Sequence, residues 1–210
     1  MNLKNIVFSL VSLLFVTNAF ADSPLTSTPF YLGYMDIAMI READKSDGII
    51  TEKQLYFLTE NSNPIALKLA LINSLKWRFE GKSNAPKYLK FLFEKKTHLN
   101  YKNFIIKASA EELICYAYIK AMDNYFDVES ATVFAKQAMR KAPTSYSIHL
   151  VGTLINVQSY LTRKESCKIY AAMNQVRMNT KLNVDIRKKS SEVVFGYTDI
   201  YKKDCKKITI

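Results

Sequence analysis

The chain has 210 residues and a formal net charge of +11, with 30 Lys and Arg against 19 Asp and Glu. Glycine and proline are scarce, at five each, which favours helices over sheets and excludes long disordered linkers. No segment alternates convincingly between apolar and polar residues at period two. The composition therefore predicts an all-α fold with little or no sheet, in a chain long enough to form a real hydrophobic core.

Residues 1–21 have the layout of a cleavable secretory signal peptide. Lys4 precedes an apolar run over 6–16, and small residues follow at Ala19 and Ala21. The run is shorter than the roughly 20 residues that a membrane-spanning helix needs, which disfavours the alternative of a retained N-terminal anchor. We therefore expect cleavage at about Ala21-Asp22 and a periplasmic or secreted protein that is not transmembrane after cleavage.

The remaining residues, 22–210, are predicted to form a single all-helical domain. Apolar periodicity and helix-boundary residues predict helices over 29–45, 51–60, 64–79, 85–96, 109–125, 127–143, 145–161, 162–179 and 184–203. The helix at 64–79 is apolar on more than one face, so we expect it to be the most buried element.

Two segments have the spacing of a capping box, in which a hydroxyl and a carboxylate satisfy backbone N–H groups at a helix start. They are Ser109-Ala-Glu-Glu112 and Thr162-Arg-Lys-Glu165. Between them, small residues recur in steps of three and four and predict close helix packing; the stripe comprises Val128, Ala131, Ala135, Ala138 and Ala142.

Residues from about 109 to 179 resemble a tetratricopeptide repeat protein, because Ala131, Ala138 and Pro143 have the spacing of the alanine, alanine and proline that close such a repeat. The chain departs from the pattern where the family prefers a large aromatic, a small residue and a tyrosine; these positions hold Cys115, Ile119 and Met122. The resemblance implies antiparallel helix hairpins stacked as a short α-solenoid whose concave face holds a peptide or protein segment. An irregular helical bundle is the alternative.

The C-terminal part, 162–210, is basic, with twelve Lys or Arg against five Asp or Glu. Candidate partner-binding residues are Arg187, Lys188, Lys189, Lys202 and Lys203. Such a surface attracts an acidic protein or peptide, or an anionic envelope surface, whereas nucleic acid is not expected outside the cytoplasm. The simpler interpretation is a solvated helix face.

Three cysteines in an oxidising compartment suggest one disulfide and one spare thiol. Cys167 and Cys205 would meet if the last two predicted helices form an antiparallel hairpin, whereas Cys115 lies in an apolar run and is expected in the core. A bridge from Cys115 to either of the others, or no bridge, remains open.

No catalytic, metal or cofactor site is predicted. The two histidines, His98 and His149, are not at metal-ligand spacing from each other or from a Cys, Asp or Glu. Asp47-Gly48 is read as a turn, because the calcium-loop register around it lacks carboxylates at most ligand positions. Glu111 and Glu112 are explained by the helix dipole.

Aromatic residues cluster in the N-terminal third of the mature chain, namely Phe30, Tyr31, Tyr34, Tyr56 and Phe57. They fit either ordinary core packing, which we favour, or a tyrosine-rich binding surface.

The preferred hypothesis is an exported, non-enzymatic helical protein that binds a protein or peptide partner in the cell envelope, with an inhibitor or immunity protein as a special case. The rival hypotheses are a periplasmic hydrolase, whose carboxylates converge only in the fold, and a structural protein of the envelope surface.

Overall fold

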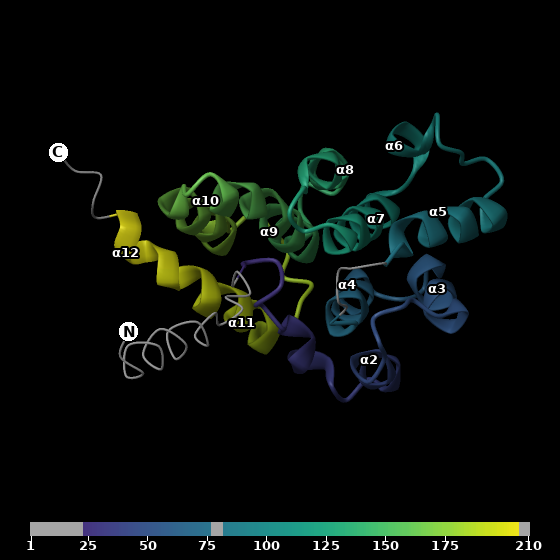
Figure 1. Cartoon of the computed structure of the whole chain (residues 1–210), viewed down its shortest axis with the longest axis horizontal. Coiled ribbons are helices and arrows are strands. Elements are labelled where there is room, and N and C mark those ends of the chain that lie inside the picture. Colours follow the sequence, from purple (N-terminus) through teal and green to yellow (C-terminus); the bar gives the residue numbers. More distant parts are fainter. Residues whose placement is uncertain (1–22, 77–81, 206–210) are drawn as a thin grey trace, which may run out of the picture.

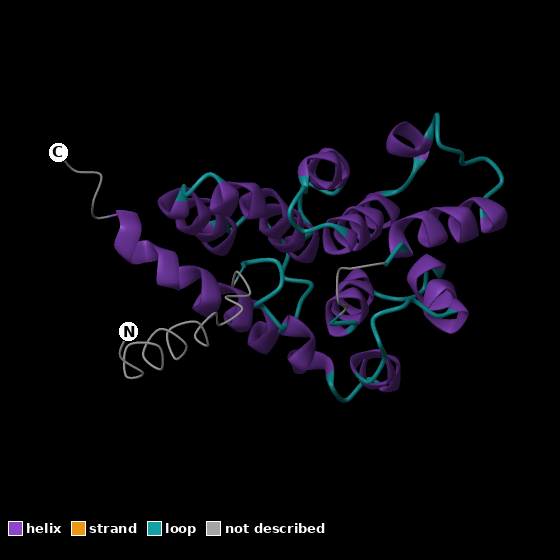
Figure 2. Ribbon diagram, viewed as in Figure 1, coloured by secondary structure: helices purple, strands orange, loops and turns teal. Residues whose placement is uncertain are grey.

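The computed structural model describes residues 23–76 and 82–205. The predicted signal peptide, its cleavage site and the residues at 77–81 and 206–210 lie outside these ranges. Within them the chain is helical and contains no strand (Figures 1 and 2), so the predicted all-α fold is confirmed. The elements are η2 (Phe30–Tyr34), α2 (Ala38–Asp44), α3 (Glu52–Thr59), α4 (Ile65–Ser74), α5 (Asn84–Lys95), α6 (Phe104–Lys107), α7 (Ala110–Asp123), α8 (Glu129–Lys141), α9 (Tyr146–Thr162), α10 (Ser166–Met178), α11 (Lys188–Thr198), η3 (Asp199–Tyr201) and α12 (Lys202–Cys205).

The helices from α7 to α10 each pack against the next in sequence, and α7 also contacts α9. The N-terminal elements gather around α4, which touches α7, α9 and η2. The last helices run back along α10, so that α11 contacts η2 and α12 contacts α10 (Figure 1). Helices packed in this way fit either a short solenoid or an irregular bundle, and the tetratricopeptide-like resemblance stays a prediction.

Helix α4 is buried on almost every side, as its sequence predicts. Nine of its ten residues are buried, including Lys68 and Asn73. The Lys68 ammonium is compensated by Glu111 at 2.7 Å, because an unpaired charge in the core is very costly. The helix ends at Ser74, earlier than predicted, and the predicted end at Phe79 with its terminator Gly81 lies outside the described residues.

A buried amide fixes the N-terminal segment to the core. Asn73 Oδ1 accepts a hydrogen bond from the Tyr31 N–H at 3.0 Å. Its Nδ2 donates to the Thr28 carbonyl at 3.2 Å and to the Tyr118 hydroxyl at 2.8 Å. Three parts of the chain, η2 with the residues before it, α4 and α7, are therefore joined through one side chain.

The capping box at Ser109 is confirmed. The Ser109 hydroxyl accepts from the Glu112 N–H, and the Glu112 carboxylate accepts from the Ser109 N–H at 2.7 Å. The alanine stripe is also confirmed, since Ala131, Ala135 and Ala138 have no exposed surface. Close packing of α8 against α7 and α9 is the result.

The second predicted capping box is wrong. Thr162 is the last residue of α9, and α10 begins four residues later at Ser166. Lys164 has φ 58°, in the left-handed region, while the Lys164 and Glu165 N–H groups donate to the Leu161 and Tyr160 carbonyls. The segment therefore closes α9 rather than opening α10.

The predicted helix at 29–45 is broken in two, and the predicted helix at 184–203 starts later than expected. The first is divided into η2 and α2 at Ile37, which is extended. The second begins only at Lys188, because the chain before it pairs with the start of α9. Asn183 exchanges backbone hydrogen bonds with Thr144 and Tyr146. The Asp185 carboxylate accepts a hydrogen bond from the Ser147 N–H at 2.6 Å.

Candidate functional site

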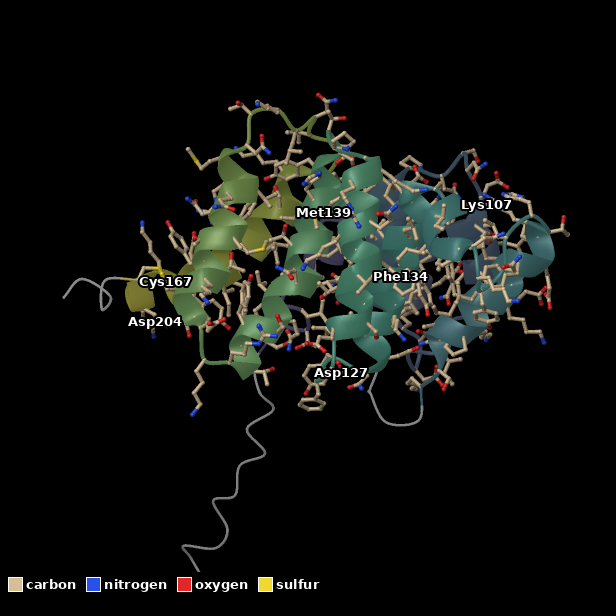
Figure 3. All side chains as sticks on the ribbon, turned by 90° about the horizontal axis from the view of Figure 1, so that it is seen from above. Lys107, Asp127, Phe134, Met139, Cys167 and Asp204 are labelled. Carbon is tan, nitrogen blue, oxygen red and sulfur yellow. A yellow bond between two sulfur atoms is a disulfide. The ribbon has the colours of Figure 1, made fainter. Side chains whose placement is uncertain are left out.

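The C-terminal helices are fastened to α10 by the two cysteines that were predicted to pair. The Cys167 and Cys205 sulfurs lie at disulfide distance, with Cα atoms 4.7 Å apart and a separation of 38 positions in sequence. Figure 3 shows Cys167 beside Asp204, where α10 meets α12. Cys115 is buried, and burial raises the pKa of its thiol to about 12, so it is protonated at neutral pH.

Arg187, a predicted partner-binding residue, instead makes contacts within the chain. Its guanidinium pairs with both carboxylate oxygens of Asp36 and lies 4.6 Å from the centre of the Tyr34 ring. Its backbone N–H donates to the Tyr34 hydroxyl at 2.9 Å. The hydrogen bonds from Arg187 lower the pKa of the Asp36 carboxyl. Arg187 thus joins the N-terminal segment to the start of α11 through an ion pair, a ring contact and a hydrogen bond.

We expect Arg187→Ala to lower Tm by about 2–4 °C, the shift that a lost surface contact of modest strength produces in a chain of this size. Partner binding should be unchanged, since the guanidinium is already engaged. Thermal unfolding followed by circular dichroism measures the first effect. An unchanged Tm would contradict a stabilising role for the Arg187 contacts with Asp36 and Tyr34.

Among the other predicted lysines, Lys202 holds its ammonium 5.8 Å from the centre of the Tyr170 ring on α10. Lys189, Lys202 and Lys203 are exposed, and none of them has an ion-pair partner in the part of the chain that the structure describes, whereas Lys188 lies 3.7 Å from Glu192. Ile200, 47% exposed, lies between these lysines on η3. We call Lys189, Ile200, Lys202 and Lys203 the C-terminal basic face; it runs along α11, η3 and α12, which follow one another in one rod (Figure 1).

A second group of exposed lysines lies on α5, next to Glu94 and to the Tyr56 ring. Lys90 and Lys95 are exposed beside Glu94, and the Lys95 ammonium lies 4.8 Å from the centre of the Tyr56 ring. Tyr56, 51% exposed, is half open to solvent, whereas Phe30, Tyr31 and Tyr34 are buried. The core interpretation of the N-terminal aromatics is thus right for the three residues of η2.

The ionisable groups of the described residues are mostly structural. No group of three or more His, Cys, Asp or Glu side chains in 23–76 and 82–205 is placed to hold a metal ion. Burial alone would raise the pKa of Glu112, but hydrogen bonds from Lys96 and the Ser109 N–H outweigh it and lower that pKa. Asp47 Oδ1 accepts from the Ile49 N–H, and Gly48 has φ 86°, so this segment is a turn.

The fold and its surface define an all-helical, basic protein whose last helices carry exposed lysines that have no ion-pair partner within residues 23–76 and 82–205. Comparison with models of protein families, with curated proteins and with solved structures gave no match. Among the described residues, no helix combines the length and the apolar character needed to cross a membrane.

Proposed function

We propose that the protein is exported and binds an acidic protein or peptide partner through the C-terminal basic face. The observation that carries this proposal is the contrast among C-terminal cations. Arg177 and Arg187 are held by Asp199 and Asp36, whereas Lys189, Lys202 and Lys203 have no ion-pair partner among the described residues. Unpaired surface cations attract anionic groups and steer their approach.

The local shape of this face also suits a partner. Gly196 is exposed on α11, and a Cβ built there would meet no atom within 4 Å. A partner chain can therefore approach the helix closely beside the exposed Ile200. An apolar side chain surrounded by charged groups is the usual anatomy of a small interface.

Two features support export. Residues 1–21 have the pattern of a signal peptide, as derived from the sequence. The geometry of Cys167 and Cys205 suits an oxidising compartment, where disulfides persist. We therefore place the protein in a periplasm or outside the cell, where the acidic partner would be an envelope or exported protein.

The test is cross-linking of the tagged full-length protein in the envelope of its native cell. A variant with Lys189→Glu, Lys202→Glu and Lys203→Glu should capture about tenfold less of one acidic partner, since three rim charges are reversed. The matched control is Lys45→Glu, Lys102→Glu and Lys136→Glu, which changes the net charge by the same amount at exposed lysines outside the C-terminal basic face. It should retain the partner.

Equal capture by the two triple variants would overturn the assignment of the face. If a folded sample captured no protein and instead bound anionic lipid vesicles in a salt-sensitive way, the protein would be held at an envelope surface and would not be a partner-binding module.

A further inference from the structure

A hollow of about 340 Å³ lies between α9 and α10. Its size falls at the lower end of the range of about 300–1,000 Å³ found for small-molecule sites. Six of the lining side chains can form hydrogen bonds: His149, Thr153, Asn156, Tyr160, Gln175 and Asn179.

The sequence of α9 produces this polar wall. His149, Thr153, Asn156 and Tyr160 follow one another in steps of four, three and four, so they lie on one stripe of the helix. The rest of α9 is largely apolar and buried; Leu150, Val151, Leu154, Ile155 and Val157 have no exposed surface. The polar stripe reaches solvent because α10 covers this side of α9 only in part.

The lining contains no lysine, arginine, aspartate or glutamate. This is notable in a chain in which 23% of residues are charged and the net charge is +11. Lys168, whose ammonium lies 5.9 Å from the centre of the Tyr160 ring, is itself paired with Glu165. The hollow therefore offers nothing to compensate an ionic ligand, and it favours an uncharged one.

Several of these polar groups lack a partner within the described residues. His149 Nε2 is enclosed and accepts or donates no hydrogen bond. The side chains of Thr153, Asn156 and Gln175 likewise make no hydrogen bond to another described residue. Because an enclosed polar atom normally has a hydrogen-bond partner, water or a ligand is expected to satisfy His149 Nε2, while the partly or fully exposed Thr153, Asn156 and Gln175 are free to bind the same ligand.

We propose that this hollow binds an uncharged carbohydrate, about one or two sugar rings of a glycan. Amide and hydroxyl side chains both donate and accept hydrogen bonds, which matches a ligand whose hydroxyls do the same. The half-buried Tyr160 at the wall of the hollow offers an apolar surface to the C–H face of a ring, and Val176 and Leu182, which are 7% and 6% exposed, add little to it. This site is additional to the C-terminal basic face and requires no acidic protein.

The test uses the full mature chain and three neutral trisaccharides, namely maltotriose, cellotriose and triacetylchitotriose, titrated by calorimetry. At least one should bind, and Asn156→Ala and Gln175→Ala should each weaken it about tenfold, because each removes hydrogen bonds to the sugar. Asn174→Ala, on α10 but outside the hollow, is the matched control and should leave the affinity unchanged. Because Gln175 is exposed, its variant tests the site even if Asn156→Ala fails to fold.

Three results would overturn the proposal: absence of binding by all three trisaccharides at about 10 mM, equal weakening by Asn174→Ala, or binding of an uncharged tetrapeptide in place of every sugar. The last result would assign the hollow to a peptide segment.

Discussion

Asn73→Ala is expected to lower the free energy of unfolding by about 2–4 kcal/mol, because it leaves two buried groups without a partner, at about 1–3 kcal/mol each before relaxation, and removes one of the two hydrogen bonds to the Thr28 carbonyl. The two groups are the Tyr31 N–H and the Tyr118 hydroxyl, whereas the Thr28 carbonyl still accepts from the Phe30 N–H at 2.8 Å. Burial raises the pKa of Tyr118, so its hydroxyl stays protonated and cannot escape the loss by ionising. Urea unfolding followed by circular dichroism measures the change.

The matched control is Tyr118→Phe, which removes one of the three hydrogen bonds and keeps the ring. We expect it to cost about 1–2 kcal/mol. If Asn73→Ala lost no more stability than Tyr118→Phe, Asn73 would not be the group that holds the N-terminal segment to α4 and α7.

The second large effect concerns the link between α10 and α12. Replacing Cys167 and Cys205 together by serine should lower the free energy of unfolding by about 2–4 kcal/mol, since the bond closes a loop of 38 residues and restricts the unfolded chain. The same urea titration measures it, and a reducing agent should have the same effect on the wild-type protein.

The reducing agent should have no further effect on the double serine variant. Cys115 provides the internal control, because it is buried and unpaired and its state does not change on reduction. A wild-type unfolding midpoint that is insensitive to the reductant would show that the pair is not bonded in solution.

Local sequence signals predict the elements whose boundaries depend on neighbouring residues. The Ser109 capping box and the alanine stripe of α8 are examples, because their hydrogen bonds and packing positions lie within one or two turns. The Thr162 box has the same spacing but lies where α9 is still helical, with Lys164 closing that helix in a left-handed conformation. No glycine indicates this closure, so spacing alone is misleading there.

Contacts between distant residues explain the remaining differences. The Tyr34 hydroxyl accepts from Arg187, 153 residues away, and Asp185 caps α9 from 38 residues further along the chain. Tyr34 is the last residue of η2, just before the break in the predicted first helix, and Asp185 lies just before the late start of the last one. Periodicity cannot show them, because it describes one segment at a time.

The candidate surface was partly predictable. Counting charges identifies the C-terminal lysines, but only the fold separates Lys189, Lys202 and Lys203 from Arg187, which Asp36 holds. The polar stripe on α9 is visible in the sequence at His149 and at steps of four, three and four after it. A stripe does not say whether a neighbouring helix covers it, so the hollow could be found only in the structure.

The most direct test of the central claim is site-specific photo-cross-linking in the native cell. A photoreactive residue at Ile200, within the C-terminal basic face, is compared with one at Ile106 on α6, which is also exposed. One acidic exported partner is expected to be cross-linked from position 200 and not from position 106. The same partner from both positions, or a partner from position 106 alone, would contradict it.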